Sequence, residues 1–370
     1  MTRARELANL GNNTTDLEAI NAVYGAGGLT GRNLIINGAM TVAQRSTSTA
    51  SITTTAYHTI DRWSTSLTTL GTWTQSQSTD VPSGQGFASS LKMACTTADA
   101  SPAAGDRLLI RQPLEGQNVQ QLKKGTANAE SITLSFWVKS SKTGTYIVEI
   151  YDQDNTRNIA KAYTVSSANT WEKKEVTFSG DTTGAFDNDA SASLYLNMWL
   201  GAGSTYTSGT LATSWEPATS ANRAVGQVNL ADSTSNEWYI TGVQLEVGST
   251  ATPFEHRSYG EELALCQRYY SNVASFNRDN FGQLYSSSQG KVALKFPVIM
   301  RADPTVTANS PFTNMLEENG VAVRTPSTAA VNYNNKSGCI MSFNVTGTAG
   351  NGLFVRQCPS DTTIEADAEL

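Results

Sequence analysis

The chain has 370 residues and a formal net charge of −6, and its charged fraction of 16% is low for a globular protein. Its length is sufficient for two or three domains with separate cores. The acidic balance, without any cluster of Lys and Arg, excludes typical nucleic-acid-binding proteins, and no apolar run approaches the ~20 residues that insertion into a membrane requires.

Residues 1–32 are predicted to form a separate attachment segment made of two short helices and a hinge. A capping box of Thr15 and Glu18 begins the second helix. Helices this short are marginal alone in water, so their apolar faces are expected to bury against a larger object. Residues 25–31, GAGGLTG, lack the Lys-Ser or Lys-Thr of a phosphate loop and are interpreted as the hinge. The apolar residues predicted to make the attachment are Leu7, Leu10, Leu17, Ile20 and Val23.

The same segment has no apolar signal region, which predicts synthesis in a cytoplasm.

Residues 33–258 are predicted to form an antiparallel β-sandwich. About a dozen short runs have the alternation of strands and are separated by turn residues, without intervening helical patterns. The first predicted strand is NLIINGAMTV, from Asn33, and we expect it to pair with the last strand because domain termini often lie close together. The clearest alternation places one set of side chains on one face: Ile132, Leu134, Phe136 and Val138.

The stretch from Asn236 to Tyr270 is predicted to join two domains. Its strand, Trp238 to Val247, has an apolar alternation that slips by one residue at Gly242, which indicates a bulge. Pro253 to Tyr259 should then follow the sandwich as an extended arm, and Glu261 to Tyr270 has helical spacing. The charged cluster at 255–257 is interpreted as an anchor of this arm.

Residues 259–370 are predicted to form a smaller C-terminal β domain that starts with this short helix. Several short alternating runs follow, bounded by Gly, Asn and Pro, and the clearest begins at Val292. The fold class is therefore mainly β, with short helices at the N-terminus and at the second domain boundary.

No catalytic residues can be assigned, and we expect a protein that is not an enzyme and carries no cofactor. Glycoside hydrolysis needs two carboxylates about 5–10 Å apart, and no pair of acidic residues is singled out by the sequence. The segments 152–158 and 181–190 resemble calcium loops, but the first lacks the Gly and Glu of an EF-hand. A structural calcium ion bound by loop oxygens is the one metal site that the sequence leaves open.

Two aromatic residues are the candidates for contact with a sugar. Glycans bind through aromatic faces combined with polar side chains that reach the hydroxyl groups. Trp215 lies in a long polar segment where exposure costs little, and Tyr206 precedes it in the same segment. The sequence therefore predicts Trp215 and Tyr206 as glycan-contact residues.

Several motifs give the chain a resemblance to bacteriophage tail-fibre and virion structural proteins. The resemblance covers about residues 33–307 and is carried by NLIINGAMTVAQR, IDRW, SITLSFWVKS, TWEKKEVTFSGDTTG, YITGVQLEVGSTATPFEHRSYGEELALCQRYY and FPVIMRADPTVT. It implies a jelly-roll sandwich like that of carbohydrate-binding modules, located on a virion. It also implies a homotrimer that contacts other virion proteins and a host-surface glycan. MTRARELANLG is similar to the start of some phage fibre proteins, where it would attach to the virion.

The resemblance is compatible with more than one role. We expect a tail fibre that docks through residues 1–32 and presents its β domains to the host. The alternatives are a head decoration or tail adaptor protein, and a depolymerase that cuts host polysaccharide.

Overall fold

The computed structural model divides the chain into two compact units, Met1–Arg257 and Ser258–Leu370. The sequence placed the second boundary between residues 258 and 259. The predicted attachment helices lie outside the described residues. The structure describes residues 31–273, 281–309, 315–320, 322–355 and 363–370.

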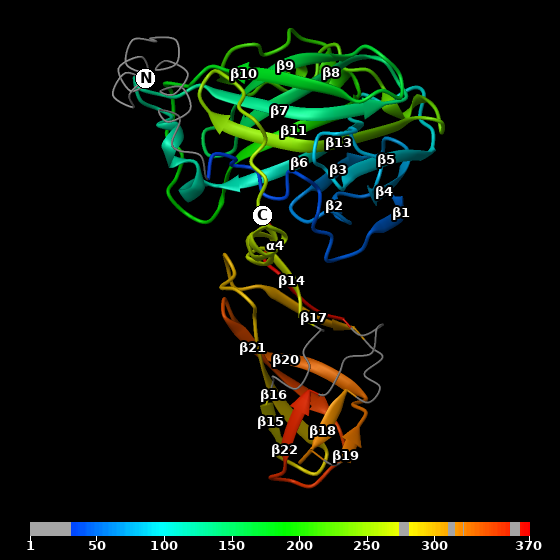
Figure 1. Ribbon diagram of the computed structural model, residues 1–370, viewed down its shortest axis with the longest axis vertical. Coiled ribbons are helices and arrows are strands. Elements are labelled where there is room, and N and C mark those ends of the chain that lie inside the picture. Colours follow the sequence, from blue (N-terminus) through cyan, green and yellow to red (C-terminus); the bar gives the residue numbers. More distant parts are fainter. Residues whose placement is uncertain (1–30, 274–280, 310–314, 321, 356–362) are drawn as a thin grey trace, which may run out of the picture. The chain divides into compact units, whose positions relative to one another are not determined.

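The first unit is a sandwich of two antiparallel sheets, and most of their strands are labelled in Figure 1. Successive strands pass between the sheets at several points, as in a jelly roll. The six-stranded sheet has the order β1 (Ser48–Ile52), β4 (Thr72–Ser78), β5 (Ser90–Thr97), β13 (Glu237–Val247), β7 (Ile132–Ser140) and β10 (Glu172–Phe178). The seven-stranded sheet has the order β12 (Glu216–Pro217), β9 (Arg157–Val165), β8 (Gly144–Asp152), β11 (Ala192–Ala202), β6 (Arg107–Glu115), β3 (Ser64–Thr68) and β2 (Ala56–Tyr57).

Short helical turns connect these strands. They are η1 (Gly116–Asn118), η2 (Gln120–Leu122), α3 (Ser204–Thr207), η3 (Ser220–Asn222) and η4 (Leu230–Asp232).

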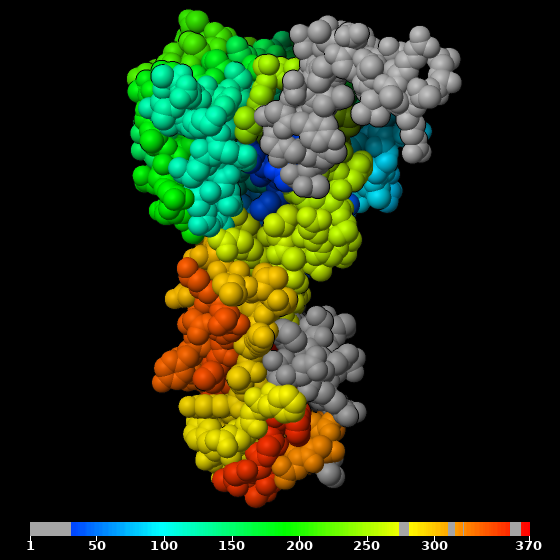
Figure 2. Space-filling view, turned by 60° about the vertical axis from the view of Figure 1, so that its left-hand side comes forward, coloured from blue at the N-terminus to red at the C-terminus, as the bar shows by residue number. Residues whose placement is uncertain are grey.

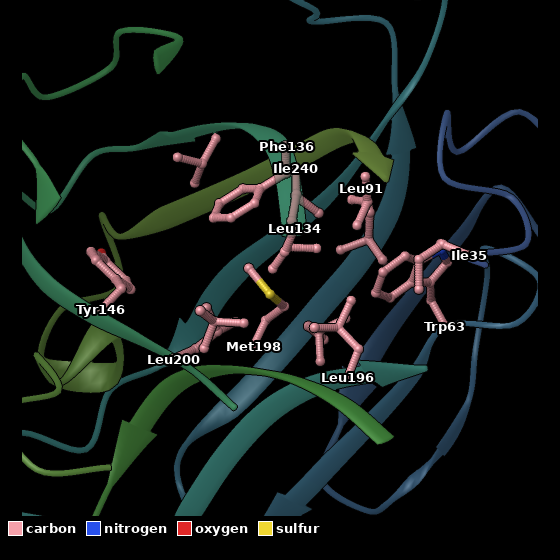
Figure 3. Close-up of a cluster of buried hydrophobic side chains, with 14 of the residues drawn as sticks. Ile35, Trp63, Leu91, Leu134, Phe136, Tyr146, Leu196, Met198, Leu200 and Ile240 are labelled. Atoms are coloured by element: carbon pink, nitrogen blue, oxygen red, sulfur yellow. The ribbon is translucent and has the colours of Figure 1, made fainter. Parts of the chain in front are cut away.

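The core fills the space between the two sheets. The predicted alternation in β7 is confirmed, because Ile132, Leu134, Phe136 and Val138 are all buried in this core. Figure 3 shows side chains of the six-stranded sheet opposite Leu196, Met198 and Leu200 of β11. Alternating strands can bury one face in this way because successive side chains point to opposite sides of a sheet.

The predicted bulge in β13 is also confirmed. Its pairing with β7 slips between Thr241 and Gln244, and Gly242 has a φ of +63°. A Cβ at Gly242 would lie 2.5 Å from the Phe87 ring. Glycine is needed there both for the backbone conformation and for the close approach of the ring.

The prediction of a strand at NLIINGAMTV is wrong. The described chain from Gly31 to Thr47 is irregular, and both Asn37 and Met40 have a φ of +58°, which a strand does not allow. The expected meeting of the domain ends still occurs, since the Leu34 amide donates to the Leu245 carbonyl at 2.9 Å. Residues 224–232 likewise contain no strand and consist of turns, irregular chain and η4.

The extended arm follows the sandwich as predicted. Glu255 accepts hydrogen bonds from the amides of Gly31 and, at 2.7 Å, of Asn33. Arg257 donates to the carbonyls of Ile35, at 3.0 Å, and Asn33. In Figure 2 the blue start of the described chain lies beside yellow-green residues of this region. The charged cluster thus fastens the two ends of the sandwich together.

The two loops that resembled calcium sites meet around an ammonium group. Lys124 Nζ lies 2.6 Å from Asp152 Oδ2 and 3.1 Å from Asp181 Oδ2. It also donates to the carbonyls of Thr183 and Gly184, at 2.8 and 2.7 Å. A lysine side chain therefore brings the positive charge to these loop oxygens. Among the described residues, no group of three or more His, Cys, Asp or Glu is arranged to hold a metal ion.

The C-terminal unit begins with a helix, as predicted, and contains two antiparallel sheets. The helix, α4 (Tyr259–Gln267), starts and ends earlier than the predicted Glu261 to Tyr270, and Tyr270 already belongs to a strand. Ser258 caps α4 by accepting from the Glu261 amide. The three-stranded sheet has the order β14 (Tyr270–Asn272), β23 (Thr363–Asp367) and β17 (Thr305–Asn309). The larger C-terminal sheet has the order β19 (Ala322–Arg324), β18 (Leu316–Glu318), β22 (Gly352–Val355), β15 (Phe281–Leu284), β16 (Gln289–Lys295), β21 (Gly338–Asn344) and β20 (Thr328–Asn335).

Within the described residues, no helix has the length and apolar character that a bilayer span requires.

Candidate functional site

The outer face of the seven-stranded sheet in the sandwich is only partly covered. The chain that follows β11 folds back over one part of this face and buries a second apolar cluster there. Trp199 is fully buried in this cluster, on the side of the sheet away from the main core. The cluster consists of Leu109, Ile147, Ala160, Trp199 and Ala224, with Ala202, Tyr206 and Leu211 packed against it.

The adjoining part of the face forms a shallow cavity of about 160 Å³. Cross-strand register brings its residues together: Tyr195 of β11 pairs with Tyr151 of β8, and Asn197 pairs with Arg111 of β6. Because side chains alternate along each strand, these residues share one face. The cavity is lined by Ser66, Arg107, Leu109, Arg111, Tyr151, Gln153, Tyr195, Asn197 and Arg223.

Glu149 is the buried anchor of this arrangement. Its fully buried carboxylate accepts two hydrogen bonds from Arg223, at 2.7 and 2.9 Å. It also accepts from Asn158, Asn197 and Trp199, at distances of 2.9 to 3.2 Å. Burial would lower the pKa of Arg223, but the charge and hydrogen bonds of Glu149 outweigh burial and raise it. These charge-assisted hydrogen bonds hold the floor of the cavity in one geometry.

Two tyrosine rings and two guanidinium groups form the walls. The rings of Tyr151 and Tyr195 are 6.4 Å apart. Arg223 lies over Tyr151 at 4.7 Å, and Arg111 lies over Tyr195 at 5.1 Å. Such contacts restrict the rings and orient the N–H groups of the arginines. The cavity thus combines fixed aromatic surfaces with hydrogen-bond donors.

Asn197 supplies a polar group that its surroundings do not satisfy. The residue is 3% exposed and its amide nitrogen donates to Glu149. Its Oδ1 is buried and has no hydrogen-bond partner among the described residues. A buried acceptor without a partner carries a free-energy cost. A ligand hydroxyl group that donated to this oxygen would remove that cost.

The structure places the two predicted glycan-contact residues in different surroundings. Tyr206 lies beside the cavity, where its hydroxyl accepts from Arg107 at 3.1 Å and its ring is 5.3 Å from that of Trp199. Trp215 packs against the main core and donates through Nε1 to the Ser179 carbonyl at 2.7 Å. Of the two, Tyr206 is thus the one in contact with a cavity residue.

Sequence reasoning missed the tyrosines and arginines that line the cavity. Tyr146, Val148 and Ile150 alternate along β8 and lie in the main core, so Tyr151 lies on the opposite face of the strand. A single strand cannot show, however, that Tyr151 stands next to Tyr195 of another strand. That information comes from the register of β8 and β11.

The outer face of the six-stranded sheet carries a larger cavity, of about 520 Å³. Trp137 of β7 lines it together with Phe87, Phe254 and His256. The last three rings pack on one another with centroids 4.8 to 5.3 Å apart. These contacts hold the arm against the sheet, and they agree with the predicted anchoring role of His256.

No protein-family model matches the chain, and no curated protein matches it.

Solved structures give similarities at low identity. A putative sugar-binding protein from Bacteroides thetaiotaomicron is 13% identical, with a TM-score of 0.31, over 58% of this chain and 100% of the other. The enzymatically active domain of tailspike protein 4 from bacteriophage CBA120 is 15% identical, with a TM-score of 0.31. The match covers 58% of this chain and 21% of the tailspike chain.

A family 11 carbohydrate-binding module from Clostridium thermocellum, in complex with a β-1,3-1,4-mixed-linked tetrasaccharide, is 12% identical, with a TM-score of 0.26. That match covers 52% of this chain and 91% of the module. The chain resembles these proteins, and its antiparallel β-sandwich is evident from its own sheets.

Proposed function

We propose that the chain is a virion structural protein, most simply a tail fibre, whose sandwich binds a host-surface glycan in the cavity between Tyr151 and Tyr195. The observation that carries glycan binding is the geometry of this cavity. Two tyrosine rings stand beside guanidinium donors and an unpartnered amide oxygen of Asn197. Sugars present apolar ring faces and many hydroxyl groups, and this combination of side chains suits both.

Binding to purified glycans tests this proposal. The full chain is applied to an array of bacterial envelope polysaccharides, and bound protein is quantified. Tyr151→Ala and Tyr195→Ala should each weaken binding about tenfold or more, because each removes an aromatic surface. Tyr285→Ala is the matched control, since Tyr285 is 46% exposed in the C-terminal unit. Absence of binding to every glycan, or equal binding by all variants, would refute the proposal.

Binding is favoured over hydrolysis by the composition of the cavity. None of the described residues that line it is Asp or Glu, and the carboxylate of Glu149 beneath it is held by Arg223. Hydrolysis of a glycosidic bond uses two carboxylates that flank it. Incubation of the chain with a bound polysaccharide should therefore release no new reducing ends. Release of oligosaccharides would support the depolymerase alternative.

Attachment to the virion is proposed to use residues 1–32. A deletion tests this role, and the contacts of Glu255 with the amides of Gly31 and Asn33 determine where the deletion should end. Removal of residues 1–30 spares these contacts and should leave a folded sandwich that no longer enters particles. Normal incorporation would contradict the attachment role. Imaging of labelled protein on whole particles separates a tail fibre from a tail adaptor or a head decoration.

Assembly as a homotrimer is proposed to involve the outer face of the larger C-terminal sheet. A cross-strand row of residues runs over this sheet from β19 to β20 and is mostly apolar, with Glu317 between Val323 and Phe354. It includes side chains that are 37 to 70% exposed: Val323, Phe281, Ile340 and Tyr333. Exposed apolar side chains that gather on one face of a sheet typically mark an interface with another chain.

A further inference from the structure

The cavity on the seven-stranded sheet has a charge opposite to that of the whole chain. Three of its lining residues are arginines, Arg107, Arg111 and Arg223, and none of its described lining residues is acidic. The chain as a whole has a net charge of −6. A cavity of one sign within low-dielectric walls attracts ligands of the opposite sign.

Only one of the three guanidinium charges is neutralised. Arg223 is paired with the buried carboxylate of Glu149. Arg107 donates to the neutral hydroxyl of Tyr206, and Arg111 donates to Ser64 Oγ at 3.3 Å. Neither Arg107 nor Arg111 forms an ion pair with a described residue.

These two arginines retain donor capacity. A guanidinium group has five N–H donors and remains charged at all relevant pH values. The buried Nε of Arg107 has no hydrogen-bond partner among the described residues. A carboxylate or phosphate group satisfies such donors in a bidentate geometry, which a sugar hydroxyl group does not.

We propose that the ligand of this cavity is an acidic saccharide, whose anionic group binds Arg107 and Arg111 while its sugar rings lie against Tyr151 and Tyr195. The inference rests on the proposed glycan-binding function and specifies the class of glycan. Within this arrangement Asn197 Oδ1, which is buried and unpartnered, accepts from a hydroxyl group of the saccharide. Arg223 and Glu149 hold the floor and contribute no free charge.

The experiment compares acidic polysaccharides with their neutralised forms. The full chain is titrated by calorimetry with an acidic bacterial polysaccharide from the array, and with the same polymer after chemical reduction of its carboxyl groups. For polymers that carry phosphate, enzymatic dephosphorylation provides the corresponding neutral probe. Loss of the anionic group should weaken binding at least tenfold, and the two treatments identify which anion is recognised.

Variants assign the effect to the two arginines. Arg107→Gln and Arg111→Gln should each weaken binding of the acidic polymer about ten- to a hundredfold, so that the difference in affinity between the acidic and the neutral form becomes much smaller. Lys173→Gln is the matched control, because it removes one charge from β10 on the other sheet, where Lys173 is paired with Glu175. Thermal unfolding of each variant confirms that it is folded.

The outcomes separate this inference from the proposed function. Equal binding of acidic and neutral forms, still dependent on Tyr151 and Tyr195, would overturn the acidic ligand and keep glycan binding. Binding of acidic polymers that is unaffected by the tyrosine substitutions would overturn both. Binding weakened as much by Lys173→Gln as by Arg111→Gln would indicate attraction to the whole surface and would also overturn the inference.

Discussion

The sandwich and the C-terminal unit differ in how far their large hydrophobic side chains are exposed to solvent. In the sandwich, a second apolar cluster around Trp199 is covered by the chain that follows β11. In the C-terminal unit, apolar side chains of the larger sheet remain at the surface. The large hydrophobic side chains that are exposed among the described residues all belong to this unit: Tyr259, Phe281, Tyr285, Ile299, Val323, Tyr333 and Ile340.

This difference is the one expected if the sandwich binds a ligand and the C-terminal unit contacts another chain. When the apolar part of a sheet is covered, the side chains left exposed on that sheet are polar and aromatic. A ligand site requires such a combination of side chains. A sheet that leaves an apolar face open has to bury it against another chain to gain the free energy of that surface. The difference therefore supports the two proposals, that the sandwich binds a glycan and that the C-terminal unit mediates assembly.

The largest effect is expected from removal of the buried ammonium group in the sandwich. Lys124→Ala leaves the carboxylates of Asp152 and Asp181 buried without that charge, and breaking a buried ion pair in this way costs about 3–5 kcal/mol. All seven tryptophans precede residue 258, so tryptophan fluorescence during denaturation reports on the sandwich alone. Lys123→Ala is the neighbouring control, because the pair of Lys123 with Glu130 is exposed and contributes under about 1 kcal/mol. Equal losses in both variants would contradict the role of Lys124.

A smaller loss is expected from Gly242→Ala. The added methyl group would meet the Phe87 ring, and alanine is strained at the positive φ of this bulge. Together these effects should cost about 1–3 kcal/mol in the same fluorescence experiment. A Cβ at Gly105 meets nothing within 4 Å, so Gly105→Ala should change stability little. An unaltered midpoint for Gly242→Ala would show that the bulge can relax.

The proposed assembly through the C-terminal unit predicts a change in oligomeric state when its exposed apolar side chains are replaced. Phe281→Ser and Tyr333→Ser remove apolar surface from the exposed row and should each weaken self-association about tenfold or more. Sedimentation velocity across a range of concentrations measures this effect. Tyr259→Ser is the control, since Tyr259 is 61% exposed on α4, outside the row. A chain that is monomeric before substitution would refute assembly through this face.

The smallest change in stability is expected on acidification, and both units should lose stability. Burial alone would raise the pKa of the Asp181 carboxyl, but hydrogen bonds from Arg157, the Thr183 amide and Lys124 outweigh it and lower that pKa. In the C-terminal unit, hydrogen bonds from the Thr348 amide, Asn351 and Arg324 lower the pKa of Glu318 to about 2.

Because the pKa values of these carboxyls are lower in the folded state than in the unfolded state, the stability of both units should decrease as the pH falls. Each carboxylate contributes its full stabilisation above its unfolded-state pKa of about 4, and the contribution is lost as the pH falls through the folded-state value. Unfolding midpoints should therefore fall between about pH 4 and pH 2. Asp181→Asn should flatten the fluorescence-detected midpoint over this range. A midpoint with unchanged pH dependence in this variant would exclude Asp181 as a contributor.

Local sequence patterns predicted the structure correctly where a feature depends on a single strand or helix. The alternation from Ile132 to Val138, the bulge at Gly242 and the helix at the start of the C-terminal unit were predicted, because side-chain period and glycine act within a few residues. The strand predicted at Asn33 failed because its apolar residues bury without forming a strand. There the side chain of Asn37 accepts from the Val42 amide and stabilises an irregular path.

The sequence by itself therefore determined the class of fold, the joining stretch around β13 and the anchoring character of residues 255–257. Only the tertiary structure decided the site. The neighbours Tyr151 and Tyr195, and Asn197 and Arg111, come from strands far apart in the chain and meet only through sheet register. The same applies to Lys124, whose ammonium group is placed between two loops by the packing of the sandwich. Contacts of this kind depend on long-range pairing, which local sequence patterns do not encode.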